Sequence, residues 1–470
     1  MTSNTTPSTR ELLLPAVSAE PARCRGRALE SALREAIRTG RLRPGTRLPS
    51  SRDLAGQLGV ARGTVTTGYA QLIAEGYLVA RHGSGTLVAD AECGAAPAAA
   101  TPARPVRWRY DLRPGIPALS AFPRAEWVAA TRAGLAGLPD DALGYPDFAG
   151  LAELRAELAG YVGRVRAVAA GPDDFVITHG VAEGMGLVAR VLRAAGHTSV
   201  AVECPGHPGQ SALFAAHGLC PVPIAVDDHG ICVDELAATG CRAVHVTSAH
   251  QFPLGVVLHP QRRRALVAWA RQRDGLILED DYDAEHRYDR HAMGALQALD
   301  PTRVAYFGSV SKVLSPALRI GWLITPPALR PAVIDAKHYN DMGGSPIPQA
   351  ALTHLLRTGG YERHLRRTRT LYRRRRDALL AAVSERLPSW QAVGVAAGLH
   401  VVLRLPDGVD DAALQRALAA SGVNAMALSG YVPSGRIAPY PGLVVGYASL
   451  GPDRLRSAVE VIAEVASLAE

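Results

Sequence analysis

The chain has 470 residues and a mass of 49.6 kDa, a length that predicts two to four domains at roughly 100–200 residues each. Its 48% hydrophobic and 20% charged residues exclude extended disorder over most of the chain. No apolar stretch reaches the roughly 18 residues that a membrane-spanning helix needs, and the apolar run at Leu12–Pro15 is too short for a signal peptide. Six scattered cysteines without a C-x-x-C pair argue against a disulfide framework or a zinc site, and fit a reducing cytoplasm.

Positive charge is concentrated in the first fifth of the chain. The net charge is +8 over the whole sequence and +5 over residues 1–90, which indicates a polyanionic partner such as nucleic acid. Lysine is almost absent, because Lys312 and Lys337 are the only two lysines among 51 cationic side chains. Covalent chemistry that requires a side-chain amine therefore has two candidates.

The first 89 residues divide into two parts. Residues 1–22 are interpreted as a flexible polar tail, and residues 23–89 as a compact module. Within the module, Leu29, Leu33 and Ile37 recur every four residues, which predicts a short amphipathic helix.

Two further helices and a hairpin complete this module. Ser50 or Ser51 is expected to cap the second helix, and the apolar spacing over residues 62–75 predicts the third. A turn at residues 82–85 separates two short β-runs. Three helices and a hairpin make a winged helix-turn-helix, an α+β fold.

The third helix of such a fold enters the major groove of DNA. Arg62, Thr64 and Thr66 lie on or near its exposed side, where they are expected to reach base edges and phosphates. His82 and Gly83 lie at the wing tip, which approaches the DNA backbone. On these features alone, a three-helix module for protein contacts remains the alternative.

The string AIRTGRLRPGTRLPSSRDLAGQLGVARGTVTTGYAQLIAEGYLVARHGSGTLVA resembles the DNA-binding domain of GntR-superfamily regulators nearly from end to end. The resemblance implies that the pattern around Arg52, Arg62, Thr64 and the wing glycines contacts operator DNA. The family usually begins its recognition helix Ser-Arg-Asn-Thr, whereas this chain has Ala61 and Gly63 around the arginine. An N-cap hydroxyl and an amide contact are missing, so a different base preference is expected.

Residues 90–106 are rich in alanine and proline and are interpreted as a linker. Residues 107–470 then alternate β-rich runs with helical patterns, which predicts an α/β domain with a parallel sheet covered by helices. From about residue 355 to 470, a long Arg-rich helix and a shorter α+β segment predict a small subdomain. The candidate strands are Phe175–Thr178, Ser199–Glu203, Ala243–Thr247, Gly275–Glu279 and Val304–Phe307.

The stretch YFGSVSKVLSPALRIGWLI (306–324) carries the first chemical signal. A β-run leads into Ser309, Ser311 and Lys312, and Arg319 follows seven residues after the lysine. This pattern suits an aldehyde cofactor that bears a phosphate, because the amine forms a Schiff base while hydroxyls and a guanidinium bind the phosphate. By itself, the S-x-S-K string is equally consistent with a solvated loop lysine.

The stretch LILEDDYDAEHRY (276–288) supports the cofactor interpretation. A hydrophobic strand ends in acids, and Tyr282 stands two residues after Asp280. An aspartate beside a pyridine nitrogen keeps that nitrogen protonated, and a nearby tyrosine can hydrogen-bond the 3-oxygen of the ring. Glu279 and Asp281 are alternatives to Asp280, which the Asp-x-Tyr spacing favours.

Two more segments fit the same cofactor. In DFVITHGVAEG (174–184) a strand turns into a helix, so the N–H groups of Gly180 and Val181 can meet a phosphate. In AVECPGHPG (201–209), His207 follows a strand and can stack on a cofactor ring. The alternatives are a plain strand–helix connection and a surface histidine.

Taken together, residues 107–470 resemble the fold-type I, class I/II aminotransferases that bind pyridoxal 5′-phosphate (PLP). The whole chain resembles MocR/GabR-type regulators, a subgroup of the GntR superfamily. Strings typical of this subgroup are DLRPGIPALSAFPRAEW (111–127), TSAHQFPLG (247–255) and GLHVVL (398–403). The resemblance implies a PLP-bound sensor domain that controls DNA binding, and a head-to-tail homodimer.

The chain departs from the aminotransferase pattern at three positions around the cofactor. An asparagine that serves the 3-oxygen is replaced by Phe252, the stacking tyrosine by His207, and a serine of the phosphate loop by His179. We therefore expect a cofactor site with weakened catalytic equipment.

A fourth departure concerns the substrate. The arginine that clamps a substrate carboxylate in aminotransferases falls on Val444 or Val445 in LVVGYASL (443–450), and Arg436 is the nearest guanidinium in sequence. Loss of this bidentate partner is expected to weaken α-amino-acid binding.

The main hypothesis is a cytoplasmic transcription regulator with PLP as an internal aldimine on Lys312, which alters DNA binding in response to an amine, an amino acid or PLP itself. The alternative is an active aminotransferase fused to a DNA-binding domain, although the sequence favours at most weak transamination. A third possibility is a DNA-binding protein whose large domain only dimerises.

Overall fold

The computed structural model describes residues 9–81, 85–90, 107–288 and 293–468. The chain forms two compact units, Met1–Val106 and Arg107–Glu470. Of the predicted linker 90–106, only residue 90 lies within the described ranges. Across those ranges, no helix combines the length and the apolar character needed to cross a lipid bilayer.

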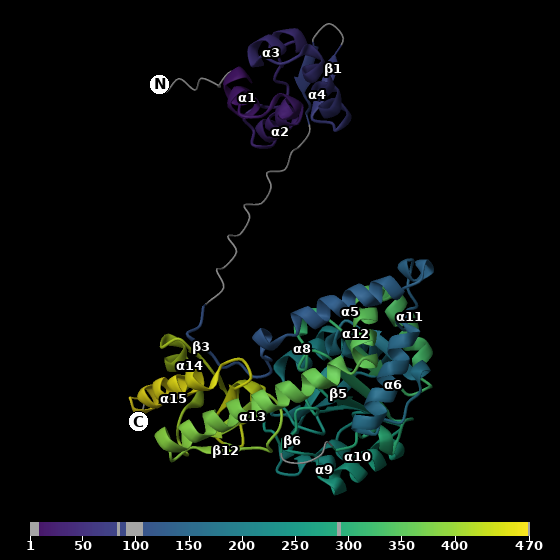
Figure 1. Cartoon of the computed structure of the whole chain (residues 1–470), viewed down its shortest axis with the longest axis vertical. Coiled ribbons are helices and arrows are strands. Elements are labelled where there is room, and N and C mark those ends of the chain that lie inside the picture. The colour runs from purple at the N-terminus through teal and green to yellow at the C-terminus, as the bar shows by residue number, and fades with distance from the viewer. Residues whose placement is uncertain (1–8, 82–84, 91–106, 289–292, 469–470) are drawn as a thin grey trace. The chain divides into compact units, whose positions relative to one another are not determined.

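The first unit is the predicted helical module with a hairpin (Figure 1). Its elements are α1 (Thr9–Ser18), α2 (Arg25–Arg38), α3 (Ser51–Leu58), α4 (Arg62–Ala74), β1 (Leu78–Arg81) and β2 (Gly85–Val88). The hairpin strands are antiparallel, with Leu78 opposite Val88. Both of these side chains are buried in the same core as Leu29, Leu33 and Leu54, so the wing packs against the helices.

The predicted flexible tail is wrong for its second half. Residues 9–18 form α1, and a short 3₁₀ turn covers Ala22–Cys24. Leu13 and Val17 stand four residues apart on one face of α1 and are fully buried in the core of the module. The apolar run is short and contains Pro15, which usually breaks a helix. The sequence therefore contains no sign of a helix that is stabilised by packing against the rest of the module.

The turn chemistry of the module agrees with its sequence. Ser50 is the N-cap of α3, because its Oγ accepts a hydrogen bond from the Asp53 N–H at 3.2 Å. Gly59 ends the helix with a φ of 62°, a left-handed conformation that glycine adopts without strain. Ala61 precedes α4 without a side-chain cap, as the missing hydroxyl predicted.

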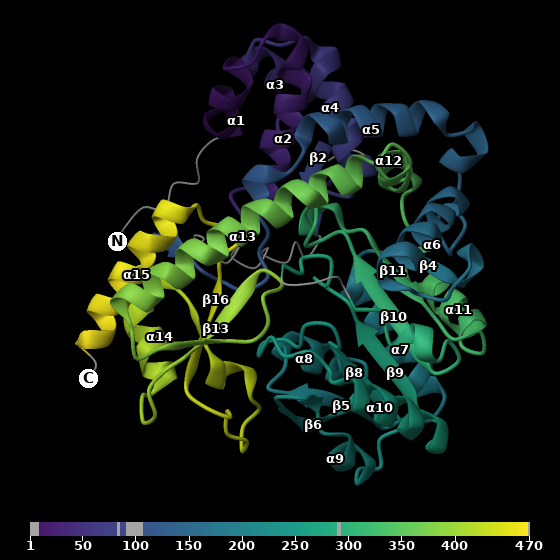
Figure 2. The same cartoon turned by 60° about the horizontal axis from the view of Figure 1, so that its bottom comes forward.

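The second unit is built on a sheet of eight strands in the order β4-β11-β10-β9-β8-β5-β6-β7. The predicted strands are β4 (Phe175–Thr178), β5 (Ser199–Cys204), β8 (Ala243–Val246), β9 (Leu276–Asp280) and β10 (Val304–Ser309). The others are β6 (Cys220–Asp227), β7 (Gly230–Ile231) and β11 (Gly321–Ile324). Figure 2 shows β8 to β11 lying side by side.

The sheet is mixed rather than wholly parallel. β11 is antiparallel to both of its neighbours, β10 and β4, while β10, β9, β8 and β5 run parallel. β4, β8, β9 and β10 are buried along their whole length, which is the burial expected for strands covered on both faces. Because β4 and β10 flank the same antiparallel strand, they point in one direction, and their carboxyl ends share an edge of the sheet.

Eight helices surround this sheet within the described part of residues 107–357. They are α5 (Arg124–Gly137), α6 (Ala152–Arg166), α7 (Val181–Ala194), α8 (Pro208–Ala216), α9 (Val233–Ala237), α10 (Pro260–Gln272), α11 (Arg330–Asp341) and α12 (Pro346–Arg357). Buried side chains of α7 share one core with β4, β5, β9 and β10, and those of α10 share another with β8 and β9. Two cores on separate sets of helices hold the sheet rigid at its centre.

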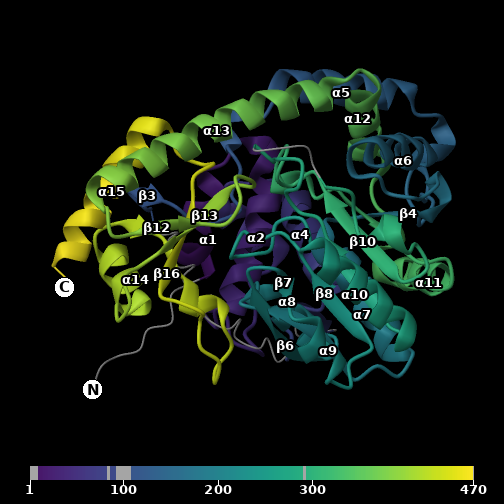
Figure 3. The same ribbon diagram turned by 90° about the horizontal axis from the view of Figure 1, so that it is seen from below.

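The small subdomain begins with the long α13 (Gly360–Arg386), which packs along α15 at one end and against α12 at the other (Figure 3). Its remaining elements are β12 (Gln391–Val393), β13 (His400–Arg404), α14 (Asp411–Ala420), β14 (Val423–Asn424), β15 (Met426–Ala427), β16 (Gly442–Gly446) and α15 (Pro452–Ser467). The four-stranded sheet is antiparallel, in the order β12-β13-β16-β15.

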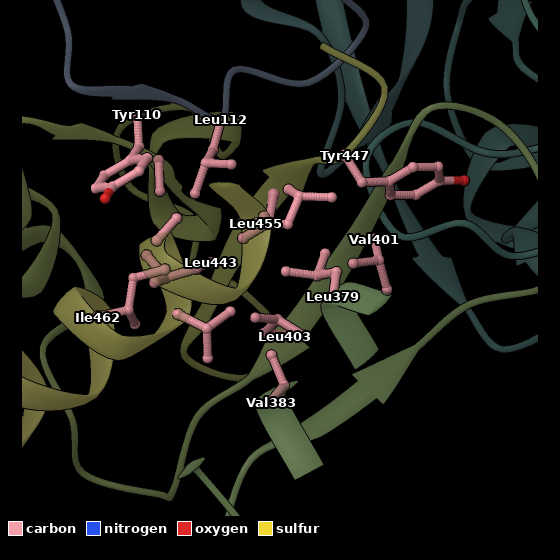
Figure 4. Packing of buried hydrophobic residues seen from close by; sticks show 14 of the residues in the cluster. Tyr110, Leu112, Leu379, Val383, Val401, Leu403, Leu443, Tyr447, Leu455 and Ile462 are labelled. Carbon is pink, nitrogen blue, oxygen red and sulfur yellow. The ribbon is translucent and has the colours of Figure 1, made fainter. Parts of the chain in front are cut away.

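An N-terminal segment also belongs to this subdomain. β3 (Tyr110–Asp111) pairs with β14, and Tyr110 and Leu112 are buried with Leu443 and Leu455 in one cluster (Figure 4). The sequence-based boundary at about residue 355 therefore misses a part of the subdomain that comes from the start of the unit. A two-residue strand carries too little periodicity to be predicted.

The burial of α1 leads to a first prediction. Leu13→Ala removes a fully buried side chain from the core of the first unit, at a cost of about 2–5 kcal/mol in its free energy of unfolding. In the full-length chain, hydrogen exchange of the α2 and α3 amides should accelerate accordingly. Ala16→Ser, on the exposed face of the same helix, is the control and should change exchange little. Unchanged protection in the Leu13 variant would contradict the packing of α1.

Candidate functional site

Several of the predicted site residues follow strands at one edge of the large sheet. Asp280 ends β9, Lys312 comes three residues after β10, Gly180 lies between β4 and α7, and His207 caps α8 after β5. The carboxyl ends of parallel strands are where open α/β sheets bind ligands. The fold therefore brings these side chains to a common edge.

Lys312 is half-buried, and its amine donates a hydrogen bond to the carbonyl oxygen of Gly115 at 2.7 Å. Removal from water lowers the pKa of this amine, while the nearby carboxylates of Asp283 and Asp280 oppose that shift. A lysine with a lowered pKa is more readily available as a neutral nucleophile.

Lys337 has a different environment. Its amine lies 3.0 Å from Glu183 Oε2 and 2.5 Å from Asp341 Oδ2, and its side chain is fully buried. Two carboxylates, one from α7 and one from α11, therefore engage this amine in a buried ion-pair cluster. Of the two lysines, Lys312 alone lies at the sheet edge with Asp280.

Asp280 is buried and only partly satisfied by the described residues. Its Oδ2 accepts a hydrogen bond from Gln210 Nε2 at 2.7 Å, and His245 Nε2 lies 3.8 Å away. Its Oδ1 is buried and has no hydrogen-bond partner in the described part of the chain. A buried carboxylate oxygen without a partner is costly, and it is suited to accept a hydrogen bond from a ligand.

The two acids beside Asp280 have structural partners. Asp281 Oδ2 lies 2.5 Å from Arg166 Nε and accepts a hydrogen bond from the Tyr306 hydroxyl at 2.6 Å. Glu279 accepts hydrogen bonds from Ser248 Oγ at 2.5 Å and from backbone N–H groups, and burial raises its pKa. Glu279 and Asp281, the alternatives that the sequence left open, are therefore bound by other groups of the protein. Asp280 differs from them because no described group binds its Oδ1.

Tyr282 belongs to a buried polar network. Its hydroxyl donates to the carbonyl oxygen of His250 at 3.0 Å and also lies 3.2 Å from His250 Nδ1. His250 Nδ1 is in turn 3.0 Å from Asp283 Oδ2. Burial raises the pKa of Tyr282 well above its usual range, so the hydroxyl stays protonated and able to donate.

The turn between β4 and α7 forms a cradle of backbone and guanidinium. Gly180 has a φ of 84° and a ψ of 173°, a region open almost only to glycine. A Cβ at this position would lie 3.2 Å from Arg319 Nη1. Arg319 also donates to the carbonyl oxygen of His179, and Val181 begins the helix, so positive groups and free helix N–H groups meet at this turn.

The two predicted serines lie close together just before Lys312. Ser309 is buried at the end of β10, and its Oγ accepts a hydrogen bond from the Ser311 N–H at 3.3 Å. No contact within the described residues ties either serine to Arg319. The two serine hydroxyls and the Gly180 cradle are therefore separate groups that lie next to each other at the same edge of the large sheet.

His207 is exposed and acts as the N-cap of α8. Its Nδ1 accepts a hydrogen bond from the Gly209 N–H at 3.1 Å, and its ring centroid lies 5.5 Å from that of Phe252. This contact places Phe252 beside His207, which follows β5 at the edge of the large sheet.

The sequence did not single out several residues that the fold brings to Lys312 and Asp280: Gly115, Gln210, His245, His250 and Asp283. Gln210 follows the inspected AVECPGHPG string by one residue, and Asp283 lies within LILEDDYDAEHRY. Asp283 is thus a polar residue within a recognised string, and Gln210 is a polar residue directly after one. Gly115 is almost 200 positions from Lys312, and no local signal indicates their contact.

In the first unit, Arg52, Arg62 and Thr66 are exposed, whereas Thr64 is half-buried. The Thr66 hydroxyl donates to the carbonyl oxygen of Arg62 at 3.0 Å, within α4. His82 and Gly83 at the wing tip lie outside the described residues.

Comparison with known families decides what this combination is. Residues 117–445 match the family model described as aminotransferase class I and II, and residues 26–88 match that of bacterial regulatory proteins of the gntR family. The chain belongs to the MocR/GabR-type transcriptional regulators. In this group a GntR-type helix-turn-helix is fused to an aminotransferase-like domain.

Relatives of similar length support this assignment. The chain is 32% identical over 459 residues to the probable rhizopine catabolism regulatory protein MocR of Rhizobium meliloti, covering 92% of each chain. It is 34% identical over 447 residues to the pyridoxine biosynthesis transcriptional regulator PdxR of Corynebacterium glutamicum, covering 94% of this chain and 95% of that one.

Solved structures confirm the fold of the second unit. An archaeal alanine:glyoxylate aminotransferase superposes with a TM-score of 0.71 at 24% identity, covering 78% of this chain and 92% of its own. The predicted fold class, an aminotransferase-like α/β domain with a smaller C-terminal α+β part, is thereby confirmed. Aminotransferases of this fold depend on PLP, and GntR-type regulators bind operator DNA.

Proposed function

We propose that this regulator holds PLP covalently on Lys312, and that an amine ligand or the supply of PLP itself changes its binding to operator DNA. The observation that carries the proposal is the position of one half-buried amine beside a buried aspartate with an unpaired oxygen. A homodimer is the proposed form, as in the family that the sequence resembles.

The residues of the site fit PLP. Among the described residues Asp280 Oδ1 has no partner, so it suits the protonated ring nitrogen. The protonated Tyr282 hydroxyl donates to the His250 carbonyl oxygen and would serve the 3-oxygen by turning away from that acceptor. The Gly180 cradle with Arg319 offers N–H groups and a guanidinium to a phosphate. When bound, PLP supplies an aldehyde that combines with amines and a ring that withdraws electrons.

The protein's own groups divide the work of holding this cofactor. The lowered pKa of Lys312 favours the neutral amine that an aldehyde requires. Gln210 donates to Asp280 Oδ2 at 2.7 Å and so fixes the direction of the free Oδ1. The network of His250 and Asp283 holds the Tyr282 hydroxyl in place.

A regulatory role fits the site better than sustained transamination. The carboxylate-binding arginine of aminotransferases falls on Val444 or Val445, and both side chains are fully buried in apolar clusters. Phe252 replaces an asparagine beside the cofactor. The groups proposed to retain the cofactor are present, whereas those that bind and orient an amino-acid substrate are replaced.

The DNA-binding part of the proposal rests on the first unit. Arg52, Arg62 and Thr66 are exposed, and the recognition helix α4 is supported by a buried core. We propose these side chains, together with Thr64 and the wing residues His82 and Gly83, as contacts to operator DNA.

Lys312→Ala tests the cofactor assignment directly. The variant should lose the visible absorption of a PLP–lysine link after incubation with PLP. It should still bind operator DNA, because the core of the first unit is unchanged, but added PLP should no longer alter that binding. Lys337→Arg removes the other lysine amine but keeps its charge beside Glu183, and should retain the absorption. A retained band in Lys312→Ala, or a lost band in Lys337→Arg, would contradict the assignment.

Gly180→Ala tests the phosphate cradle. The added Cβ would lie 3.2 Å from Arg319 Nη1 and displace the guanidinium from the cradle, so the dissociation constant for PLP should rise by about tenfold, which corresponds to about 1.4 kcal/mol. Gly196→Ala is a matched control, because its φ is 83° and nothing lies within 4 Å of an added Cβ. Equal effects of both substitutions on PLP affinity would remove the cradle from the proposal.

Arg62→Ala tests the recognition helix. Loss of the exposed guanidinium should weaken operator binding by about 1–3 kcal/mol in a gel-shift titration, with an unchanged cofactor spectrum. Arg38→Ala, on the exposed end of α2 outside the recognition helix, is the comparison and should have a smaller effect. Unaltered affinity in the Arg62 variant would exclude this contact.

A further inference from the structure

A groove of about 630 Å³ lies between the start of α5 and the first turns of α13. Arg363, Arg366 and Arg367 of α13 line it, and Glu126 of α5 is the one acid among its described lining residues. A second hollow of about 360 Å³ shares Glu126 and Arg367 with the first and adds Arg124. The two hollows together are here called the arginine groove. The larger one alone has the size of a small-molecule site, roughly 300–1,000 Å³.

The positive charge of the second unit is concentrated on this part of α13. Residues 360–376 contain eight arginines and a single acid, Glu362, which pairs with Arg164 at 3.1 Å. The other residues from 91 to 470 include more acidic than basic side chains. Like charges gathered on one helix repel each other. A bound anion would relieve this repulsion.

Two helices begin at the groove. Pro123 is the N-cap of the 14-residue α5, and Gly360 is the first residue of the 27-residue α13. Both residues line the larger hollow. The first N–H groups of a helix and the positive end of its dipole favour a bound anion, so the backbone adds to the charge of the arginines.

The guanidinium groups of the groove are only weakly engaged by the protein. Arg366 has no hydrogen-bond or ion-pair partner for its side chain among the described residues. Arg367 lies 3.3 Å from Glu126, and the two side chains are 61% and 49% exposed. Arg363 donates to the carbonyl oxygen of Thr358 at 2.7 Å. Because exposed ion pairs contribute little to stability, an anion in the groove can replace Glu126 at Arg367.

His364 joins the groove to the segment that carries Lys312. It lines both hollows, is 3% exposed, and donates from Nε2 to the carbonyl oxygen of Val313 at 2.9 Å. Its Nδ1 is buried and has no partner in the described part of the chain. A buried nitrogen of this kind at the wall of a hollow calls for a partner, which a solvated helix face does not supply.

We propose that the arginine groove binds a small organic phosphate, at a site separate from the proposed PLP site. The arginines and the helix ends bind the phosphate group. The apolar floor, which includes Leu314 and Leu355, receives the organic part of the ligand and favours a small molecule over the phosphates of DNA. Of the residues assigned to PLP above, none lines either described hollow.

Phenyl phosphate, which joins a phosphate to an apolar ring, tests the proposal by calorimetric titration of the full-length chain without PLP. It should bind at least about tenfold more tightly than phenol or inorganic phosphate, each of which has only one of the two parts. Arg366→Ala should weaken its binding by about tenfold, which corresponds to about 1.4 kcal/mol. Glu126→Gln removes the carboxylate that competes for Arg367 and should strengthen binding severalfold, a gain that a misfolded variant cannot imitate.

Arg374→Ala is the matched control, because Arg374 is an exposed arginine of α13 outside the groove, and it should leave the affinity unchanged. Equal losses in the Arg366 and Arg374 variants would reveal a general effect of charge and overturn the proposal. A loss in Arg319→Ala but not in Arg366→Ala would place the probe in the Gly180 cradle, with the same consequence.

A chain that does not bind phenyl phosphate also overturns the proposal. If Arg366→Ala then weakens the binding of a non-operator DNA duplex in a gel-shift titration, the arginines contact DNA instead. Since the titration with phenyl phosphate needs no PLP, its failure leaves the assignment of PLP to Lys312 untouched.

Discussion

The hydrogen bond from the Lys312 amine to the Gly115 carbonyl is the contact on which the site depends. Lys312 follows the central strand β10 of the large sheet. Gly115 follows β3, which pairs with β14 in the small subdomain. The amine therefore joins two parts of the unit that have separate cores. A covalent bond between this nitrogen and an aldehyde would leave it fewer N–H donors for the Gly115 carbonyl, so chemistry at Lys312 bears on the contact between the sheet and the subdomain.

Around this amine, the groups suited to a cofactor are kept and the groups suited to a substrate are changed. No residue in the described part of the chain binds Asp280 Oδ1, and the backbone conformation of Gly180 leaves room beside Arg319 that a Cβ would fill. In the proposed site, by contrast, Phe252 replaces an asparagine of the aminotransferases, and Val444 and Val445, on one of which their carboxylate-binding arginine falls, are buried in apolar clusters. We propose that such a site uses its interactions to hold the bound ligand and not to stabilise a transition state. This is what a sensor requires.

The sequence predicted the fold of both units well, because their signals are local. The central strands are continuous hydrophobic runs, and the boundaries of Phe175–Thr178 agree with β4 at both ends. Ser50 and Gly59 mark the ends of α3 by their side-chain and backbone chemistry. Some of the strands that were missed, such as β3 and β11, are two to four residues long and are stabilised by partners distant in the chain. The longest missed strand, the eight-residue β6, contains Pro221 and Pro223, which disguise a strand pattern.

The site was predictable where motif spacing carries the chemistry, and not where the fold joins distant segments. Lys312 and Asp280 stand in two strings with recognisable spacing, and parallel neighbouring strands bring them to one edge. Gly115 and His400 reach the site from opposite ends of the second unit, and no periodic pattern links them to it. The helix α1 was missed for the same reason. Leu13 and Val17 mark one face of a helix only once the core that buries them is known.

The most direct test of this account is to identify the residue that carries the cofactor. The full-length chain is incubated with PLP, reduced with borohydride and digested, and the modified peptide is identified by mass spectrometry. The account predicts a phosphopyridoxyl group on Lys312 and none on Lys337. An unmodified Lys312, or modification of Lys337 in its place, would contradict it.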